Sequence, residues 1–311
     1  MAQRLPSFFM LAVEVSRALQ SGTPVVALES AVITHGLPRP ENLELARRVQ
    51  VEVSAQGAVP ATIAVLRGKL RVGLEDAELE ELANAAPVRK ISLRDFGAAV
   101  ADLATGGTTV AGSLAAARLA GIRVFATGGI GGVHHGAAWD VSADLTALAH
   151  IPIVVVCSGA KAILDLPATL EYLETAGVPV IGYQTAEFPA FYSRESGLHV
   201  DASVRTPAEA ARIARAHWDM GLSSAVVVTV PPPEEAALPR ERVEGWVQQA
   251  VEEAHKNGIV GPAVTPFLLR RVSELSGGES LVANLALLAN NARVAAQIAA
   301  ELAPRKRFAS I

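Results

Sequence analysis

Hydrophobic positions follow two alternating patterns along the chain. Short continuous apolar runs predict strands that are covered on both faces of a sheet, at residues 25–28, 62–66, 124–127, 153–157, 178–183 and 225–230. The longer segments between them repeat apolar residues every three or four positions, which predicts amphipathic helices. These helices are expected at residues 41–56, 76–86, 109–119, 165–176, 206–220, 239–256 and 280–302. The alternation of strands and helices is typical of an α/β protein.

Residues with known end preferences mark several helix boundaries. Thr206 stands before Pro207, which pairs a capping side chain with proline at the first helical position. Asp165 takes the same capping place, two residues before a proline. Glycines follow three of the predicted helices, at Gly177, Gly221 and Gly258. The boundary signals therefore agree with the hydrophobic periodicity.

One turn changes the expected sheet from parallel to mixed. The tripeptide Arg67-Gly68-Lys69 stands between two apolar runs and predicts a tight hairpin. The strongest linker signal, Pro231-Pro232-Pro233, is soon followed by a helical pattern, so we interpret it as a rigid turn that leaves a strand. We therefore predict that residues 1–311 form a single α/β/α layered domain around a central mixed, mostly parallel sheet.

Composition limits the classes of function. The 311-residue chain is 50% hydrophobic and 19% charged, which supports a large core and excludes disorder as its main state. It has 27 Lys and Arg against 31 Asp and Glu, a formal charge of −4, so nothing in its charge favours a nucleic-acid partner. We expect a small-molecule substrate. Cys157 is the single cysteine, which excludes an intramolecular disulfide framework and fits a reducing compartment.

The N-terminal apolar patch, residues 8–13, is expected to be neither a signal peptide nor a membrane span. Glu14 interrupts it and no small-residue cleavage site follows, so we predict an amphipathic helix capped by Ser7. Elsewhere Gly, Pro or charged residues break every apolar stretch before the roughly 18 to 20 residues that a span needs. We expect a cytoplasmic protein with no membrane partner.

The region from Thr105 to Asp144 is unusually rich in glycine. Residues 128–136 hold five glycines, more than a single turn requires. They do not form a dinucleotide loop, because His134 occupies the place of the third required glycine and no helical pattern opens there. A Walker-type loop is also absent, since no Gly-Lys pair is followed by Ser or Thr. Two interpretations stay open: a cradle for an anion or phosphate, and a tight turn between packed elements.

Charged residues directly after predicted strands are the main candidates for chemistry. Lys161 follows the strand 153–157 and a short turn, at a strand end where ligands of α/β proteins bind, and its amine could attack a carbonyl-like carbon. Glu29 follows the strand 25–28 and could act as a general acid or base. Lys90 would be a simple cation for a phosphate. Each has an alternative: Lys161 could be a surface lysine, Glu29 the structural partner of an ion pair, and Lys90 a solvated lysine.

Other polar residues give weaker signals. Asp140 and Asp144, with Ser142, could hold a hard divalent cation, but aspartates at this spacing also serve as helix caps or solvated pairs. His134 and His135 are neighbours whose side chains point apart in extended structure, so at most one is expected to face a site. A zinc site is not expected, because no third His or Cys stands at ligand spacing. Cys157 is expected to be a buried small hydrophobe.

Several motifs, taken together, closely resemble the pseudouridine-5′-phosphate glycosidases, a family once named for indigoidine synthase A. They lie at residues 27–38 (ALESAVITHGLP), 107–110 (GTTV), 125–136 (FATGGIGGVHHG), 141–145 (VSADL), 158–161 (SGAK), 182–185 (GYQT), 265–269 (TPFLL), 284 (N) and 290–293 (NNAR). The resemblance spans nearly the whole chain. It implies reversible cleavage of the C-glycosidic bond of pseudouridine 5′-phosphate to uracil and ribose 5-phosphate, by a homotrimer that uses a divalent metal, typically manganese.

The resemblance also implies a role for each matching residue. Lys161 would be the covalent nucleophile and Glu29 the proton donor. Asp140 would hold the metal, largely through water. Substrate contacts would come from Val110, Ser142, Ala143 and Asp144, phosphate contacts from Lys90, His134 and Thr109, and a contact with the uracil edge from Asn284.

The implied chemistry needs an amine because carbon, not a heteroatom, must leave. A lysine imine with ring-opened ribose is an electron sink, which lets the carbon–carbon bond break once the uracil carbon is protonated. The sequence leaves two alternatives. A non-catalytic sugar-phosphate-binding protein would have no need for Glu29 or Lys161, and a nucleotide-dependent oxidoreductase is disfavoured by the missing third glycine.

Overall fold

A computed structural model describes residues 5–135, 140–259 and 264–304. Within these residues eleven strands form one sheet, in the order β1-β4-β3-β2-β7-β9-β13-β11-β12, with β6 beside β3 and β5 beside β6. Most neighbours are parallel, while β3 runs antiparallel to β4 and β6. The predicted α/β class with a mixed, mostly parallel sheet is confirmed, as is the hairpin at Arg67-Gly68.

The strands and helices predicted between residues 25 and 302 are all present, with ends shifted by at most three residues. The strands are β1 Phe9–Leu11, β2 Val25–Leu28, β3 Val59–Leu66, β4 Lys69–Val72, β5 Arg89–Ile91, β6 Gly106–Thr108, β7 Val124–Ala126, β8 Val133–His134, β9 Val154–Cys157, β10 Leu164–Asp165, β11 Val180–Tyr183, β12 Ala202–Val204 and β13 Val226–Thr229. The helices are α1 Val13–Ser21, α2 Glu41–Ala55, α3 Asp76–Asn84, α4 Phe96–Ala101, α5 Val110–Ala120, α6 Ala143–His150, α7 Leu166–Thr175, α8 Pro207–Asp219, α9 Arg240–Lys256, α10 Val264–Leu275 and α11 Glu279–Leu302.

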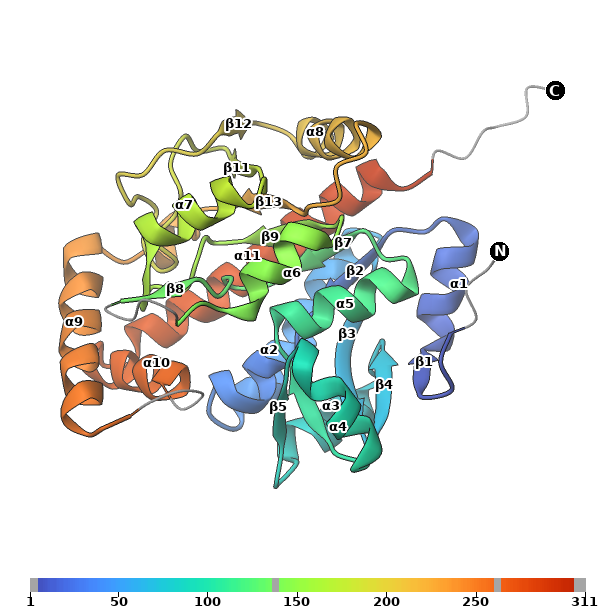
Figure 1. Cartoon of the computed structure of the whole chain (residues 1–311), viewed down its shortest axis with the longest axis horizontal. Helices are drawn as coiled ribbons and strands as arrows, with labels where there is room; N and C mark the ends of the chain where they lie inside the picture. Colours follow the sequence, from blue (N-terminus) through green and yellow to red (C-terminus); the bar gives the residue numbers. More distant parts are fainter. Residues whose placement is uncertain (1–4, 136–139, 260–263, 305–311) are drawn as a thin grey trace.

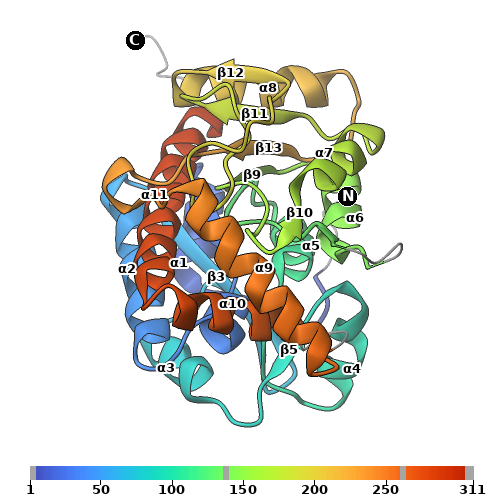
Figure 2. The same ribbon diagram turned by 90° about the vertical axis from the view of Figure 1, so that its left-hand side faces the viewer.

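Helices cover both faces of the sheet. In Figure 1, α5 and α6 lie in front of the strands, and the long α11 passes behind them. α11 packs on α2 and α8 and against β2, β7 and β9, so its apolar face closes the back of the core. Figure 2 shows α9 and α10 packed side by side next to α11. No helix among the described residues is long and apolar enough to cross a membrane.

The N-terminal prediction is wrong. Residues Phe9–Leu11 form strand β1, parallel to β4, and helix α1 begins only at Val13, with no side-chain cap. The open edge of β4 explains the difference, because the Leu70 amide donates to the Phe8 carbonyl oxygen and Phe9 is buried. A strand partner 61 residues away thus outweighs the local helical pattern.

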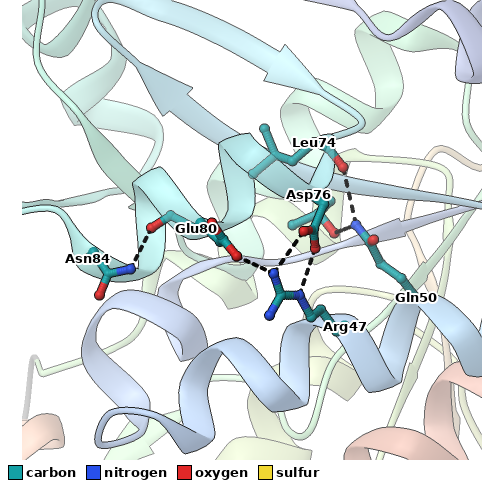
Figure 3. A network of polar contacts seen from close by, with 7 residues as sticks. Arg47, Gln50, Leu74, Asp76, Glu80 and Asn84 are labelled. Carbon is teal, nitrogen blue, oxygen red and sulfur yellow. Dashed lines mark hydrogen bonds and ion pairs between the residues drawn. The ribbon is translucent and has the colours of Figure 1, made fainter.

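A surface network joins α2 to α3 beside the sheet (Figure 3). The Arg47 guanidinium donates to both carboxylate oxygens of Asp76, at 2.6 and 2.8 Å, and also pairs with Glu80. This two-pronged ion pair holds the pKa of Asp76 below its ordinary value. Because these side chains are exposed, the network orients α3 and contributes little to stability.

The sheet order places the strand ends that matter for chemistry. From β2 the chain continues to its neighbour β3 on one side, and from β7 it continues to β9 on the other. The pair β2 and β7 is therefore a topological switch point, where α/β proteins form a ligand crevice beyond the carboxyl ends of the strands. Glu29 and Thr127 are the residues that follow these two strands.

Candidate active site

Glu29 lies at the switch point and is almost fully buried, with 8% of its surface exposed. Thr127 donates a hydrogen bond from its hydroxyl to the Glu29 carboxylate. Burial raises the pKa of Glu29 above its ordinary value, and the Lys161 charge and the Thr127 hydrogen bond lower it in part. A carboxyl in this environment can hold a proton at a pH where an exposed glutamate has lost it.

Lys161 reaches the same place from the end of β9. The turn that carries it is fixed by a parallel bridge to the glycine loop, in which Ile130 donates to Gly159 and Lys161 donates to Ile130, both at 3.1 Å. Gly159 has φ +83°, a conformation that glycine adopts without strain. The Lys161 charge acts on Glu29, Lys90 and His134, so these groups share one electrostatic environment.

A small cavity of about 50 Å³ lies between these residues. Its lining includes Glu29, Lys90, Lys161 and Asn284, which the sequence had singled out, together with His35, Gly128, Gly129, Phe191, Thr265, Pro266, Leu269 and Leu288. A second space of about 320 Å³ adjoins it and shares His35, Gly36, Pro266, Leu269 and Asn284. The two together form a continuous region over the strand ends, with α10 and α11 on one side.

A larger cavity of about 470 Å³ lies elsewhere, between α9 and the residues after Lys161. Its wall is mainly apolar, with Val243, Val247 and Val251 from α9. At its edge the Arg240 guanidinium donates a hydrogen bond to the Glu244 carboxylate. Because this cavity contains neither the buried carboxyl nor the two amines, the smaller cavity is the candidate active site.

Lys90 brings positive charge to the cavity wall, and His35 adds an imidazole. Burial, and after it the Lys161 charge, lowers the pKa of Lys90. Burial and the Lys90 charge lower the pKa of His35 as well, and His35 Nδ1 lies 2.6 Å from Thr34 Oγ1. Two amines and an imidazole around one buried carboxyl favour an anionic ligand.

Asp144 does not face the solvent, as a metal ligand shared with Asp140 would. Its Oδ1 accepts from the Ala111 amide at 2.9 Å and its Oδ2 from the Gly131 amide at 2.8 Å. It is buried, whereas Asp140 is exposed, so these contacts give no support to a cation held between the two aspartates. The alternative, that Asp144 caps a helix end, describes it better.

Asp144 also brings two helix N-termini together. Thr109 caps α5 by accepting from the Gly112 amide, and Ser142 caps α6 by accepting from the Asp144 amide. Val110 is buried beside them and Ala143 is exposed. The amino ends of both helices carry partial positive charge, which suits a phosphate.

His134 and Asp140 lie on the flank of the cavity and not in its lining. Their backbones pair, since the His134 amide donates to the Asp140 carbonyl oxygen at 3.0 Å. The pKa of His134 is lowered, first by burial, while the Asp140 charge raises it. No cluster of three or more His, Cys, Asp or Glu among the described residues could hold a metal. The donor set fits only a hard cation that keeps most of its waters.

The glycine-rich loop serves both of the interpretations that the sequence left open. Gly128 and Gly129 line the cavity. Gly131 and Gly132 are required for packing, because a Cβ at Gly131 would collide with Ser142 and Asp144, and one at Gly132 with Thr169. Strand β8, not a helix, follows, which agrees with the rejection of a dinucleotide loop. Gly136 and Trp139 lie outside the described residues.

Three residues near the cavity have no role assigned from the sequence: Phe191, and Thr127 and Asn291, which lie within the family motifs 125–136 and 290–293. Thr127 is a polar residue directly after an apolar strand, and the same signal singled out Glu29. Asn291 is a fully buried amide on the apolar face of α11, and a polar residue at a core position was its signal. Phe191 had no signal, because its positive φ of +60° depends on tertiary packing. Cys157 is fully buried, as expected, and burial raises the pKa of its thiol to about 12.

Comparisons with known proteins agree with this geometry. The family model of the Indigoidine synthase A like protein matches residues 14–301, and the chain belongs to this family. It is 55% identical over 291 residues to the pseudouridine-5′-phosphate glycosidase of Solibacter usitatus, covering 93% of this chain and 97% of the relative. The glycosidase of that name from Chloroflexus aurantiacus is 55% identical over 298 residues, covering 94% of this chain and 98% of the relative.

Solved structures of the same fold were also found. The prealnumycin C-glycosynthase AlnA, in complex with ribulose 5-phosphate, superposes with a TM-score of 0.88 at 41% identity, covering 96% of this chain and 98% of that one. An indigoidine synthase A-like protein from Thermotoga maritima has a TM-score of 0.88 at 37% identity, covering 96% and 99%. At these identities, with relatives that are enzymes, this chain is an enzyme of the family.

Proposed function

We propose that the enzyme reversibly cleaves the C-glycosidic bond of pseudouridine 5′-phosphate and gives uracil and ribose 5-phosphate. The observation that carries the proposal is the convergence of a buried carboxyl, Glu29, and an amine, Lys161, beside Lys90 and Asn284 in one cavity. The relatives' printed name and the pentose 5-phosphate in the related C-glycosynthase complex support the same substrate class.

In this mechanism the Lys161 amine bonds to the anomeric carbon as the ring oxygen leaves it, so that the ribose ring opens and an amine adduct that still carries uracil is formed. The nitrogen lone pair then forms the C=N bond of the imine as the bond between ribose and uracil breaks, and the electron pair of the broken bond passes to the uracil carbon. Glu29, protonated because burial raises its pKa, donates a proton to the uracil carbon as that bond breaks. Water then hydrolyses the imine, which releases ribose 5-phosphate and restores the Lys161 amine.

The remaining candidates bind and orient the substrate in this proposal. Lys90 pairs with the phosphate, His134 donates a hydrogen bond to it, and Thr109 contacts it at the amino end of α5. Val110, Ser142 and Ala143 contact the sugar from the same helix ends, with Asp144 holding them in place. Asn284, which projects from α11 into the cavity, offers an amide to the uracil edge.

A divalent cation, Mn²⁺, belongs to the proposal through Asp140. The exposed Asp140 carboxylate would hold it mainly through water, and the cation would supply positive charge for the phosphate. We also propose a cytoplasmic homotrimer. Dialysis against a chelator, followed by Mn²⁺ titration of the wild type and Asp140→Ala, tests the first point by the change in melting temperature; equal Mn²⁺ responses would contradict it.

The decisive experiment is a trap for the imine. The protein is incubated with Mn²⁺ and ribose 5-phosphate, reduced with borohydride and weighed intact by mass spectrometry, with Lys161→Ala in parallel. We expect one sugar-phosphate adduct on the wild type and none on the variant. If no adduct forms while uracil and ribose 5-phosphate still condense, Lys161 is only a binding cation. If neither occurs, the proposed reaction is wrong.

A further inference from the structure

One side chain of α11, Asn291, joins the ends of β7 and β9. Its amide nitrogen donates to the Thr127 carbonyl oxygen at 2.9 Å and to Ser158 Oγ at 3.1 Å, and it also reaches the Gly128 carbonyl oxygen at 3.4 Å. Two carbonyl acceptors on this side fix the orientation of the amide, because they require an N–H donor. Asn291 therefore links two adjacent strands through a third element.

The position of Asn291 would otherwise suit an apolar residue. It is fully buried, and Leu287, Leu288 and Ala292 beside it on α11 belong to the main core. An amide in such surroundings is costly unless it is hydrogen-bonded, while a leucine there would leave the Thr127 carbonyl oxygen without this donor. The amide thus has a task that the packing of α11 alone does not require.

Both partners of Asn291 lead into the candidate active site. Thr127 donates from its hydroxyl to Glu29. Ser158 begins the turn that carries Lys161, and its carbonyl oxygen accepts from the amide of Phe191, which lines the cavity. Asn284, two helical turns before Asn291 on α11, lines the same cavity.

We propose that Asn291 is a positioning residue, which holds the ends of β7 and β9 together and thereby sets where the Glu29 carboxyl stands relative to the Lys161 amine. Its catalytic consequence rests on the proposed function. The coupling of Asn291 to Glu29 through Thr127 is independent of the proposed function, because it follows from the hydrogen bonds alone.

The surroundings of Glu29 make this coupling measurable. The groups that act on its charge are Lys161, Lys90, Asp144 and the Thr127 hydroxyl. Asn291 is uncharged, and its hydrogen bonds go to Thr127, Gly128 and Ser158. An effect of Asn291 on Glu29 therefore passes either through the placement of Thr127 or, by way of Ser158, through the placement of Lys161, and a Thr127→Val background separates the two.

A double-mutant cycle between Asn291→Leu and Thr127→Val tests this route. The readout is the protonation of Glu29, followed by infrared difference spectroscopy and assigned with Glu29→Gln. We expect Asn291→Leu to increase the proton affinity of Glu29 about tenfold in the wild-type background, since the Thr127 hydrogen bond that favours the ionised form weakens. In the Thr127→Val background we expect no further change. Asn290→Leu, one position along the helix, is the matched control and leaves Glu29 unchanged.

The kinetic readout separates positioning from a general loss of structure. We expect Asn291→Leu to lower kcat on the order of 10- to 100-fold with a smaller change in KM, because reacting groups are misplaced while binding contacts stay. Asn291→Asp keeps the size but offers no amide donor to Thr127, so it serves as a second variant if the leucine variant does not fold. Rescue is not expected from it.

Independent effects would overturn the proposal. If Asn291→Leu changes the proton affinity of Glu29 equally with and without the Thr127 hydroxyl, the route through Thr127 is wrong. If Asn291→Leu lowers the melting temperature but leaves kcat and the proton affinity of Glu29 unchanged, Asn291 is a structural residue only. If the wild type does not cleave pseudouridine 5′-phosphate, the proposed function fails, and the infrared cycle still decides the coupling.

Discussion

Thr127 donates a hydrogen bond from its side chain to the carboxylate of Glu29, a residue 98 positions earlier in the chain. The two meet because Leu28 and Ala126, the residues before them, are register partners on the parallel strands β2 and β7. Burial raises the pKa of Glu29 and this hydrogen bond opposes the rise. The contact between two strand ends therefore tunes the proposed proton donor.

Replacing Glu29 by Gln is expected to abolish turnover and to stabilise the protein at neutral pH. The folded state holds the Glu29 proton more tightly than the unfolded chain, whose pKa is near 4.5, so the wild type loses stability as the pH rises from 4.5 through the folded pKa. Gln keeps an acceptor for Thr127 and never ionises. Melting temperatures of both proteins from pH 4 to 8 should diverge as the pH rises. Parallel curves would mean that Glu29 titrates normally.

Replacing Lys90 by Met is expected to weaken substrate binding and to raise the pKa of His35. Loss of a charged hydrogen bond to the phosphate should raise KM about 10- to 100-fold. The pKa of His35 should rise because the Lys90 charge, after burial, lowers it. Steady-state kinetics and proton NMR titration measure the two effects. Lys69→Met, at an exposed position, is the control. If the pKa of His35 does not change in Lys90→Met, the Lys90 ammonium does not lie near His35.

Replacing Asp144 by Asn is expected to lower the free energy of unfolding by about 1–3 kcal/mol. The carboxylate accepts from two buried amides, of Ala111 and Gly131, whereas an Asn amide has one oxygen and turns a donor toward the other N–H. Urea denaturation measures the loss, and the exposed Asp140→Asn should stay within about 0.5 kcal/mol of wild type. An Asp144→Asn protein of normal stability but no activity would instead make Asp144 a substrate contact.

Two glycine-to-alanine changes should act in opposite directions. Gly131→Ala should destabilise by about 1–3 kcal/mol, because the added methyl group would lie 2.7 Å from Asp144 Oδ2. Gly245→Ala, within α9 and with no atom in reach of the added carbon, should stabilise by about 0.5–1 kcal/mol. Equal effects in urea denaturation would contradict the packing role of the glycine-rich loop.

The site residues could be predicted where a local sequence motif marks them, and not where their role depends on residues far away in the chain. Glu29, Lys90, Lys161 and Asn284 line one cavity, as the sequence motifs suggested. The pairing of Asp140 with Asp144 on one cation finds no support in these contacts, because the Asp144 carboxylate accepts from backbone amides of α5 and the glycine loop. These donors lie 33 and 13 residues from Asp144 in the chain, so the local sequence does not reveal them.

The sequence by itself determined the strands β2, β3, β7, β9, β11 and β13 and most of the longer helices. Continuous apolar runs and the three-to-four-residue spacing reflect burial on one or two faces, and the residues that carry the pattern lie in the segment itself. Thr206 and Asp165, for example, cap the predicted helices through bonds to amides three residues away.

Only the tertiary structure decided which strand ends become neighbours. Phe9–Leu11 became a strand because β4 offered an open edge, and Glu29 received Thr127 and Lys161 as partners because β2, β7 and β9 lie side by side. Strand pairing, desolvation and the charge around a buried carboxyl are set by residues that are far apart in the chain. The chemical environment of the site is therefore a property of the assembled sheet and of α11 behind it.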